Sequence, residues 1–107
     1  MAFFVIKIPT MFYIYILYSQ SADRFYIGQT PDVQKQLWEH NNPVEKSKYI
    51  PWEIILYFPV SNERGDAMKV EKFIKAQKNR KFILKLIDNK DDLRFFQKLI
   101  ADVMSVG

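Results

Sequence analysis

YIYILYS (Tyr13–Ser19) and RFYIGQT (Arg24–Thr30) are two strand-like segments near the start of the chain, and the expected architecture is built outward from them. Both are rich in aromatic and β-branched residues, and the polar residues between them are typical of a turn. The pair therefore predicts a β-hairpin.

Tyrosines and a glycine are expected to meet on one surface of this hairpin. Strand side chains alternate between two faces, so Tyr13 and Tyr15 share a face of the first strand, and Tyr26 and Gly28 share a face of the second. Ordinary cross-strand packing also produces tyrosine-rich strands, and the hairpin alone indicates no function.

The composition describes one small folded domain. The chain has 107 residues, 49% of them hydrophobic, which is enough to bury a core without covalent staples. It has no cysteine, which excludes disulfides and thiolate metal sites. A net charge of +4 favours polyanionic partners without requiring them.

Residues 1–10, MAFFVIKIPT, contain an apolar run that Lys7 and Pro9 interrupt. The run is too short to cross a bilayer and lacks the flanks of a signal peptide, so we expect a cytoplasmic protein with no membrane partner. Three interpretations of this extension stay open: an added edge strand, a packing arm, or a consequence of start-site choice.

A helix is expected directly after the hairpin. Thr30 can cap it, Pro31 suits the first helical position, and Asp32 favours the positive end of the helix dipole. The helix should run to about His40, where the polar and proline residues 41–43 end it.

Two polar side chains of this helix are expected to project together toward the hairpin. Val33 and Leu37 define its inward stripe, and Gln36 and His40 lie four residues apart along one edge of that stripe. His40 is the only histidine of the chain. A histidine at a helix C-terminus can also be simply a favourable partner of the dipole.

The apolar run Trp52–Pro59 predicts a third strand of the same sheet. The loop before it carries Lys46, Lys48 and Tyr49. These residues suit contact with a phosphate backbone, and they equally suit an ordinary solvated loop.

Helical spacing begins near Asn62, and Glu71 falls within its apolar stripe. A carboxylate among apolar side chains needs a partner. A divalent cation is one candidate, and an ordinary ion pair with Lys75, one turn later, is the other. The stripe comprises Ala67, Val70, Ile74 and Lys78.

The segment 66–85 carries seven basic residues against two acidic ones, which indicates a solvated helix face or a phosphate-binding surface.

Asn79 and Arg80 are expected to interrupt the helix. A helix over 81–87 should follow, with Phe82, Leu84, Leu86 and Ile87 in the core. A final amphipathic helix over 91–104 should cover the sheet or form a dimer face. Its inward positions are Leu93, Phe96, Leu99, Ile100 and Val103.

The order of these features resembles the GIY-YIG nuclease superfamily. Tyr13-Ile14-Tyr15 and Tyr26-Ile27-Gly28 are similar to the two halves of its signature. The helix with His40, the apolar strand and the helix with Glu71 follow in the family's order. The resemblance spans about residues 11–87. It is strongest to small stand-alone bacterial members related to the nuclease domain of excision-repair enzymes, which implies a role in DNA repair.

The resemblance implies a role for each site residue. Tyr15 would help to activate the attacking water, Tyr26 would position water or phosphate, and His40 would accept a proton. Glu71 would be the single protein ligand of one Mg²⁺ or Mn²⁺ ion. Gln36 stands where the family usually has an arginine that stabilises charge on the scissile phosphate.

Two departures from the family pattern accompany these matches. Glutamine brings no charge to position 36, and the adjacent Lys35 lies about 100° further around the helix. The asparagine that many members place beyond the metal glutamate has no counterpart, because Ile83 stands at the expected distance.

The sequence therefore predicts an α+β fold, a small and mostly antiparallel three-stranded sheet flanked by helices. Residues 1–10 would be an extension, 11–90 the nuclease-like domain, and 91–107 a helix packed on the same domain.

The expected activity is metal-dependent hydrolysis of DNA phosphodiesters, without a small-molecule cofactor and with a homodimer possible. A non-catalytic nucleic-acid-binding domain and a protein-interaction module are the alternatives. The residues expected to contact nucleic acid are Gly28, Lys35, Lys48, Lys75, Lys78, Arg80 and Lys81.

Overall fold

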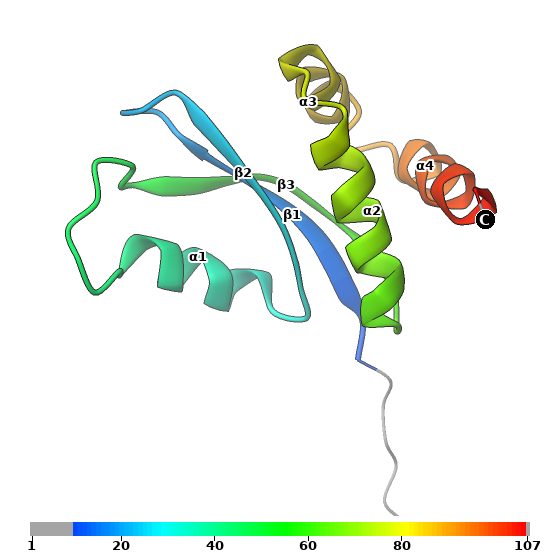
Figure 1. The fold of residues 1–107 in the computed structure, drawn as a ribbon, viewed down its shortest axis with the longest axis horizontal. Coiled ribbons are helices and arrows are strands. Elements are labelled where there is room, and N and C mark those ends of the chain that lie inside the picture. Colours follow the sequence, from blue (N-terminus) through cyan, green and yellow to red (C-terminus); the bar gives the residue numbers. More distant parts are fainter. Residues whose placement is uncertain (1–9, 107) are drawn as a thin grey trace, which may run out of the picture.

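The computed structural model of the protein describes residues 10–106, and it confirms the α+β fold as a three-stranded antiparallel sheet with four helices (Figure 1). The expectations for residues 1–9 lie outside the described part. The elements in chain order are β1 (Phe12–Ser19), β2 (Arg24–Thr30), α1 (Val33–Asn41), β3 (Trp52–Ser61), α2 (Arg64–Ala76), α3 (Arg80–Asp88) and α4 (Leu93–Ser105).

Strand β1 is the centre of the sheet, with β2 on one side and β3 on the other. Both neighbours run antiparallel to it, and the β1–β2 register places Tyr15 opposite Gly28. The predicted hairpin is therefore present. Strand β3 continues past Pro59 to Ser61 at the edge of the sheet, where a proline is tolerated.

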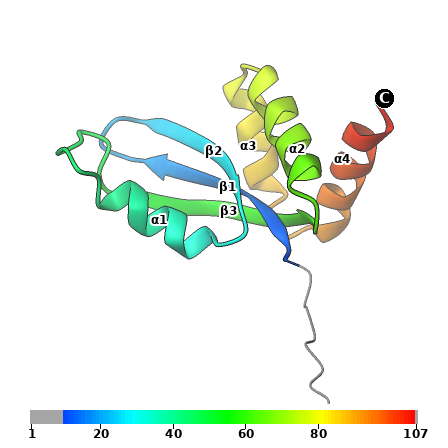
Figure 2. The same cartoon turned by 60° about the horizontal axis from the view of Figure 1, so that its bottom comes forward.

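The sheet separates two apolar clusters of different size. Helix α1 covers one face, over a small cluster built on Tyr15, Leu17 and Val33. Helices α2, α3 and α4 gather on the other face, over the main core that includes Ile14 and Ile16 (Figures 1 and 2). The alternation along β1 therefore sends Tyr13 and Tyr15 toward α1, and Ile14 and Ile16 toward the larger core.

Helix α1 begins later than its sequence signals predict. Thr30 is still in β2, and its hydroxyl oxygen accepts a hydrogen bond from the Asp32 amide at 3.1 Å. Asp32 is the true N-cap, because its carboxylate accepts from the Lys35 amide at 3.0 Å. The expectation of a Thr30 cap with Pro31 in the first turn is wrong, since Thr30 is committed to the sheet.

The two C-terminal helices also differ in detail from the prediction. Helix α3 begins at Arg80, with Asn79 as its cap, and buries Ile83 where Leu84 was expected. Leu84 and Leu93 are 45% and 57% exposed, so neither belongs to the core.

Helix α4 packs on the main core. Phe96 is 3% exposed and stacks on Phe58 of β3, with the ring centroids 4.3 Å apart. This helix therefore contributes to the same core as the sheet. Among residues 10–106, no helix combines the length and the apolar character needed to cross a membrane.

Candidate active site

The ring of Tyr15 lies directly against the backbone of Gly28. A Cβ atom added at Gly28 would stand 2.4 Å from the Tyr15 hydroxyl oxygen, closer than two such atoms can approach. Tyr15 is 2% exposed, so its ring has little room to move aside. The signature glycine is therefore required by packing, because it opens the space that the signature tyrosine fills.

The Tyr15 hydroxyl points from β1 to the first turns of α1. It donates a hydrogen bond to Gln36 Oε1 at 3.2 Å, and Gln36 Nε2 lies 3.5 Å from Glu39 Oε2. Both ends of the Gln36 amide thus have partners. Gln36 holds the tyrosine in place and adds no positive charge to the site.

Burial raises the pKa of Tyr15 well above its ordinary value, and the neighbouring Tyr26, Glu71 and Glu39 act in the same direction. The hydroxyl is therefore protonated at neutral pH. A general base needs the opposite shift, so in the protein alone Tyr15 is a hydrogen-bond donor.

His40 is oriented by the main chain of its own helix. Its Nδ1 lies 2.8 Å from the carbonyl oxygen of Gln36. A carbonyl can only accept, so Nδ1 carries the proton and Nε2 keeps a free lone pair in the neutral ring. The ring centroid is 4.4 Å from that of Tyr26 and 6.3 Å from that of Tyr15. The structure thus brings Tyr15, Tyr26, Gln36 and His40 together.

Glu71 approaches this group from α2, on the other side of β2. Its side chain is 24% exposed, and Lys75 Nζ lies 3.6 Å from its carboxylate. Lys75 Nζ is also 6.0 Å from the centre of the Tyr26 ring. The ion pair weighed from the sequence is present, and it lies beside the tyrosines.

A single carboxylate fits the way proteins hold Mg²⁺. That ion commonly takes one or two carboxylates and completes its shell with water and phosphate oxygens. Within the described residues, no three histidine, aspartate or glutamate side chains gather into a cluster. Glu71, partly buried and acting on the electrostatics of Tyr15, suits a mononuclear site with an open side.

The basic residues expected to bind nucleic acid lie in three places. Lys35 is on α1 and pairs with Glu39 at 4.0 Å, while Lys48 is in the loop before β3, over the ring of Tyr49. The third place is the α2–α3 junction. There, a hollow of 400 Å³ is rimmed by Lys75, Lys78, Arg80 and Arg24, and Lys81 is exposed nearby on α3.

Gly28 does not join these basic residues as a contact point. It is buried, and the Tyr15 ring covers it. The expected contact between Gly28 and nucleic acid is therefore not available on the face that bears the tyrosines.

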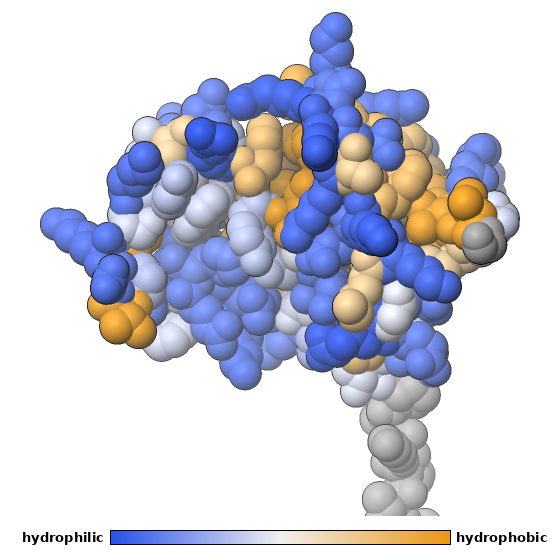
Figure 3. Space-filling view, viewed as in Figure 1, coloured by the Kyte–Doolittle hydropathy of each residue, from blue (hydrophilic) through white to orange (hydrophobic). Residues whose placement is uncertain are grey.

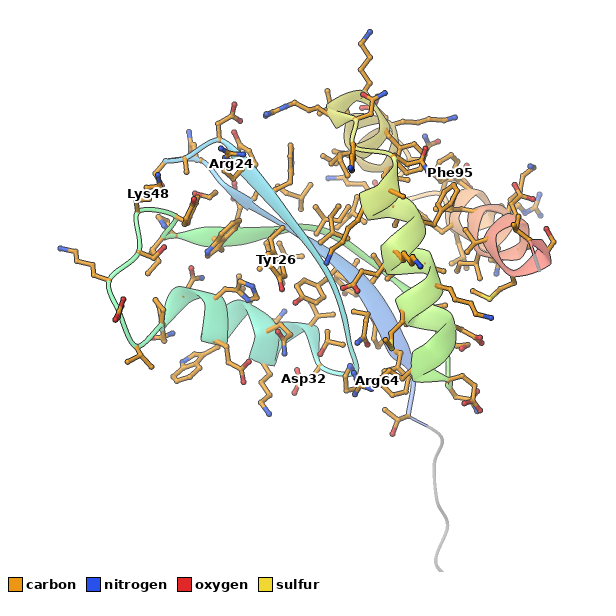
Figure 4. The ribbon with its side chains drawn as sticks, viewed as in Figure 1. Arg24, Tyr26, Asp32, Lys48, Arg64 and Phe95 are labelled. Carbon is orange, nitrogen blue, oxygen red and sulfur yellow. The ribbon has the colours of Figure 1, made fainter. Side chains whose placement is uncertain are left out.

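Trp52 was missed as a site residue because its place at the start of an apolar run suggested only strand core. Its ring centroid lies 5.9 Å from that of His40 and 6.2 Å from that of Tyr26, both at steep angles. Figure 4 shows Tyr26 on the side of β2 that faces α1, where these rings meet. The usable signal was the alternation that places Trp52 and Ile54 on the tyrosine face.

The surface around these rings has a mixed character. Figure 3 shows hydrophilic side chains over α1 and along α2, with side chains of intermediate hydropathy on the left of the view between them. An aromatic wall flanked by basic and polar residues suits an aromatic and anionic ligand, as a nucleotide is.

The comparisons with known proteins agree with this geometry. The family model of the GIY-YIG catalytic domain matches residues 11–85. No curated protein and no solved structure matches the chain. With 11–85 covering the sheet, α1, α2 and most of α3, this chain belongs to the GIY-YIG family, whose domains are typically nucleases.

Proposed function

We propose that the protein is an endonuclease that hydrolyses DNA phosphodiesters with one divalent cation. The observation that supports this most is the orientation of His40. Its Nδ1 proton is held by the Gln36 carbonyl, which leaves Nε2 as a proton acceptor beside Tyr26. Family membership and the Glu71 carboxylate across β2 agree with the same activity.

The residues of this chain would divide the hydrolysis as follows. His40 Nε2 takes a proton from a water molecule while the water oxygen bonds to phosphorus. The P–O bond to the leaving oxygen then breaks, and that oxygen takes a proton from solvent. The Tyr26 hydroxyl, on a residue 40% exposed, positions the phosphate or the water.

Tyr15 is a positioning residue in this scheme. Its ring packs on Gly28 and its hydroxyl donates to Gln36, so its position is fixed. It would thereby limit where the water molecule and the Tyr26 ring can lie. Glu71 would hold Mg²⁺ or Mn²⁺, which when bound supplies positive charge that stabilises the leaving oxygen.

Gln36 sets the expected rate. An arginine at this place would add a charged fork facing the phosphate, and glutamine adds none. Loss of one such electrostatic contact costs about 10²–10³ in rate. We therefore propose a slow enzyme, in which Lys75, with its Nζ 6.0 Å from the centre of the Tyr26 ring, supplies positive charge beside the site.

Nicking of supercoiled plasmid in Mg²⁺ and in Mn²⁺ tests this function. We expect Gln36→Arg to raise the nicking rate, because the new guanidinium faces the phosphate, and Glu71→Ala to abolish it. Glu63→Ala is the matched control. That glutamate is exposed, makes no capping hydrogen bond, and should leave the rate unchanged.

Two results would count against the proposal. Unchanged cleavage by Glu71→Ala would remove the metal assignment. Inert native and Gln36→Arg proteins, on plasmid, branched and single-stranded DNA, would remove the nuclease. The second result would favour a non-catalytic DNA-binding domain, which the missing charge at position 36 already suggests. DNA binding that does not weaken as the salt concentration rises would instead point to a protein-interaction module.

A further inference from the structure

A second hollow opens beside the candidate active site. It measures 330 Å³ and is lined by Glu39, His40, Pro43, Ser47 and Trp52. A cavity of about 150 Å³ holds a benzene ring, so this one has room for a purine or a pyrimidine. His40 belongs to both the hollow and the active site, so an occupant would lie next to the reacting phosphate.

The hollow has an aromatic floor that is held in place. Tyr49 stacks on Trp52, with the ring centroids 5.8 Å apart and the planes 20° from parallel. Asn41 fixes the backbone of Trp52 on both sides, because its Nδ2 donates to the Trp52 carbonyl at 3.0 Å and its Oδ1 accepts from the Trp52 amide at 2.7 Å.

The loop that forms the outer wall is anchored as well. The Ser21 hydroxyl, from the β1–β2 turn, donates to the Lys48 carbonyl at 2.8 Å. The Lys48 ammonium then lies 5.4 Å from the centre of the Tyr49 ring. The aromatic surface and its cation are therefore in place before any ligand arrives.

We propose that this hollow receives one unpaired nucleobase next to the scissile phosphate, so that branched, flapped or gapped DNA is cleaved in preference to intact duplex. This inference rests on the proposed nuclease function. A base within a duplex is stacked and paired, and extruding it costs free energy that an already unpaired base does not require.

The charges of the hollow favour a base over a phosphate inside it. The Glu39 carboxylate at its wall repels phosphate oxygens and can accept a hydrogen bond from an exocyclic amino group. Lys48 at the outer side can meet the phosphate attached to the same nucleotide. Stacking on aromatic rings tolerates any base, so the preference is for DNA structure and not for sequence.

Tryptophan fluorescence tests the proposal without catalysis. The chain has two tryptophans, Trp38 and Trp52, and Trp38 is 65% exposed on α1. In Trp38→Phe protein, with EDTA to prevent cleavage, we expect branched DNA to quench the Trp52 emission. A fully paired duplex, or the same branch with an abasic site at the unpaired position, should not quench it.

Matched variants make the result specific. In Trp52→Phe protein only Trp38 emits, and branched DNA should leave that emission unchanged. Trp52→Ala should weaken binding of branched DNA about tenfold by anisotropy, with intact duplex little affected. Trp52→Phe, which keeps an aromatic ring, should restore most of the affinity.

The outcomes separate this inference from the proposed function. Trp52 quenching in EDTA, together with no cleavage when Mg²⁺ or Mn²⁺ is supplied, would support the base site and reject the nuclease. Plasmid nicking by a protein whose Trp52 emission no DNA alters would reject the base site alone. Equal quenching by the abasic branch would also overturn it, because the signal would then come from the backbone.

Discussion

At the scale of single residues, His40 shows how the main chain can prepare a side chain for chemistry. Its tautomer is set by the Gln36 carbonyl and not by the Gln36 side chain. A substitution at position 36 therefore changes the charge at the site and leaves the histidine in place. Gln36→Arg also replaces the acceptor of the Tyr15 hydroxyl with a group that only donates, so it tests the added charge together with that hydrogen bond.

The contact between Gly28 and Tyr15 leads to a prediction at the same scale. Gly28→Ala should lower the free energy of unfolding by about 1–3 kcal/mol, because the methyl group overlaps the Tyr15 hydroxyl. Displacing Tyr15 by about 1 Å should also slow nicking by about 10². Urea unfolding and the plasmid assay measure the two effects.

Gly65→Ala is the control for this substitution. Gly65 lies in the first turn of α2, and a Cβ there meets nothing within 4 Å. Alanine should leave the stability unchanged or raise it by up to ~1 kcal/mol, since it is the better helix former. Equal unfolding midpoints for the native and Gly28→Ala proteins would show that Tyr15 is free to move.

At the scale of elements, the α2–α3 junction brings basic side chains from both helices to one place on the surface. Lys78 directly follows Gln77, the C-cap of α2, and has a positive φ of 46°, and Asn79 caps α3. This sharp change of direction brings Lys75, Lys78 and Arg80 around one hollow. Arg80 is already paired with Asp23, so the two lysines are better placed to meet a phosphate.

Lys78→Gln should therefore reduce the salt dependence of DNA binding. One lost phosphate contact lowers the slope of log K against log salt by about 0.9 on duplex DNA. Lys90→Gln is the control, because Lys90 is exposed in the turn before α4, beside β3. Anisotropy titrations over a range of salt measure both slopes, and identical slopes for the two variants would exclude the junction from the interface.

The elements were largely predictable from the sequence, and their ends were not. Period-two alternation and apolar runs located all three strands, because burial on a sheet enforces those patterns. The start of α1 was misplaced because Thr30 and Asp32 are both good caps, and only sheet pairing decides between them. The sequence predicts Leu84 in the core, but the structure buries Ile83 instead, because the apolar residues of so short a helix are compatible with two different inward faces.

The candidate site was predictable only where the family pattern covered it. The family resemblance predicts four site residues, and the structure brings them close to one another: Tyr15, Tyr26, His40 and Glu71. Trp52 was not named, because its contact with His40 depends on how the loop returns to β3. Long-range geometry of this kind leaves no periodic signal in a single sequence.

At the scale of the whole molecule, the family match and the folded unit have different extents. The match ends at residue 85, yet α4 places Phe96 in the main core against Phe58. The last helix is therefore part of what keeps the sheet covered. The folded unit of this chain therefore extends beyond the matched residues.

Two substitutions in α4 test its structural role. Phe96→Ala should lower the free energy of unfolding by about 3–5 kcal/mol, because it removes a buried ring and leaves a cavity. Leu93→Ala, on an exposed residue of the same helix, should change it by no more than ~0.5 kcal/mol. Urea unfolding followed by circular dichroism measures both, and equal effects would show that α4 is not part of the core.

The paired hydrogen bonds between Asn41 and Trp52 have a consequence for how such a domain can be diversified. They join the two ends of the segment 42–51. The distance between the end of α1 and the start of β3 is therefore fixed by hydrogen bonds from the Asn41 side chain to the Trp52 main chain. Surface loops tolerate changes of length at little entropic cost when their ends are fixed. We therefore expect that this segment can be exchanged for one of another length while Tyr15, Tyr26 and His40 keep their contacts with one another.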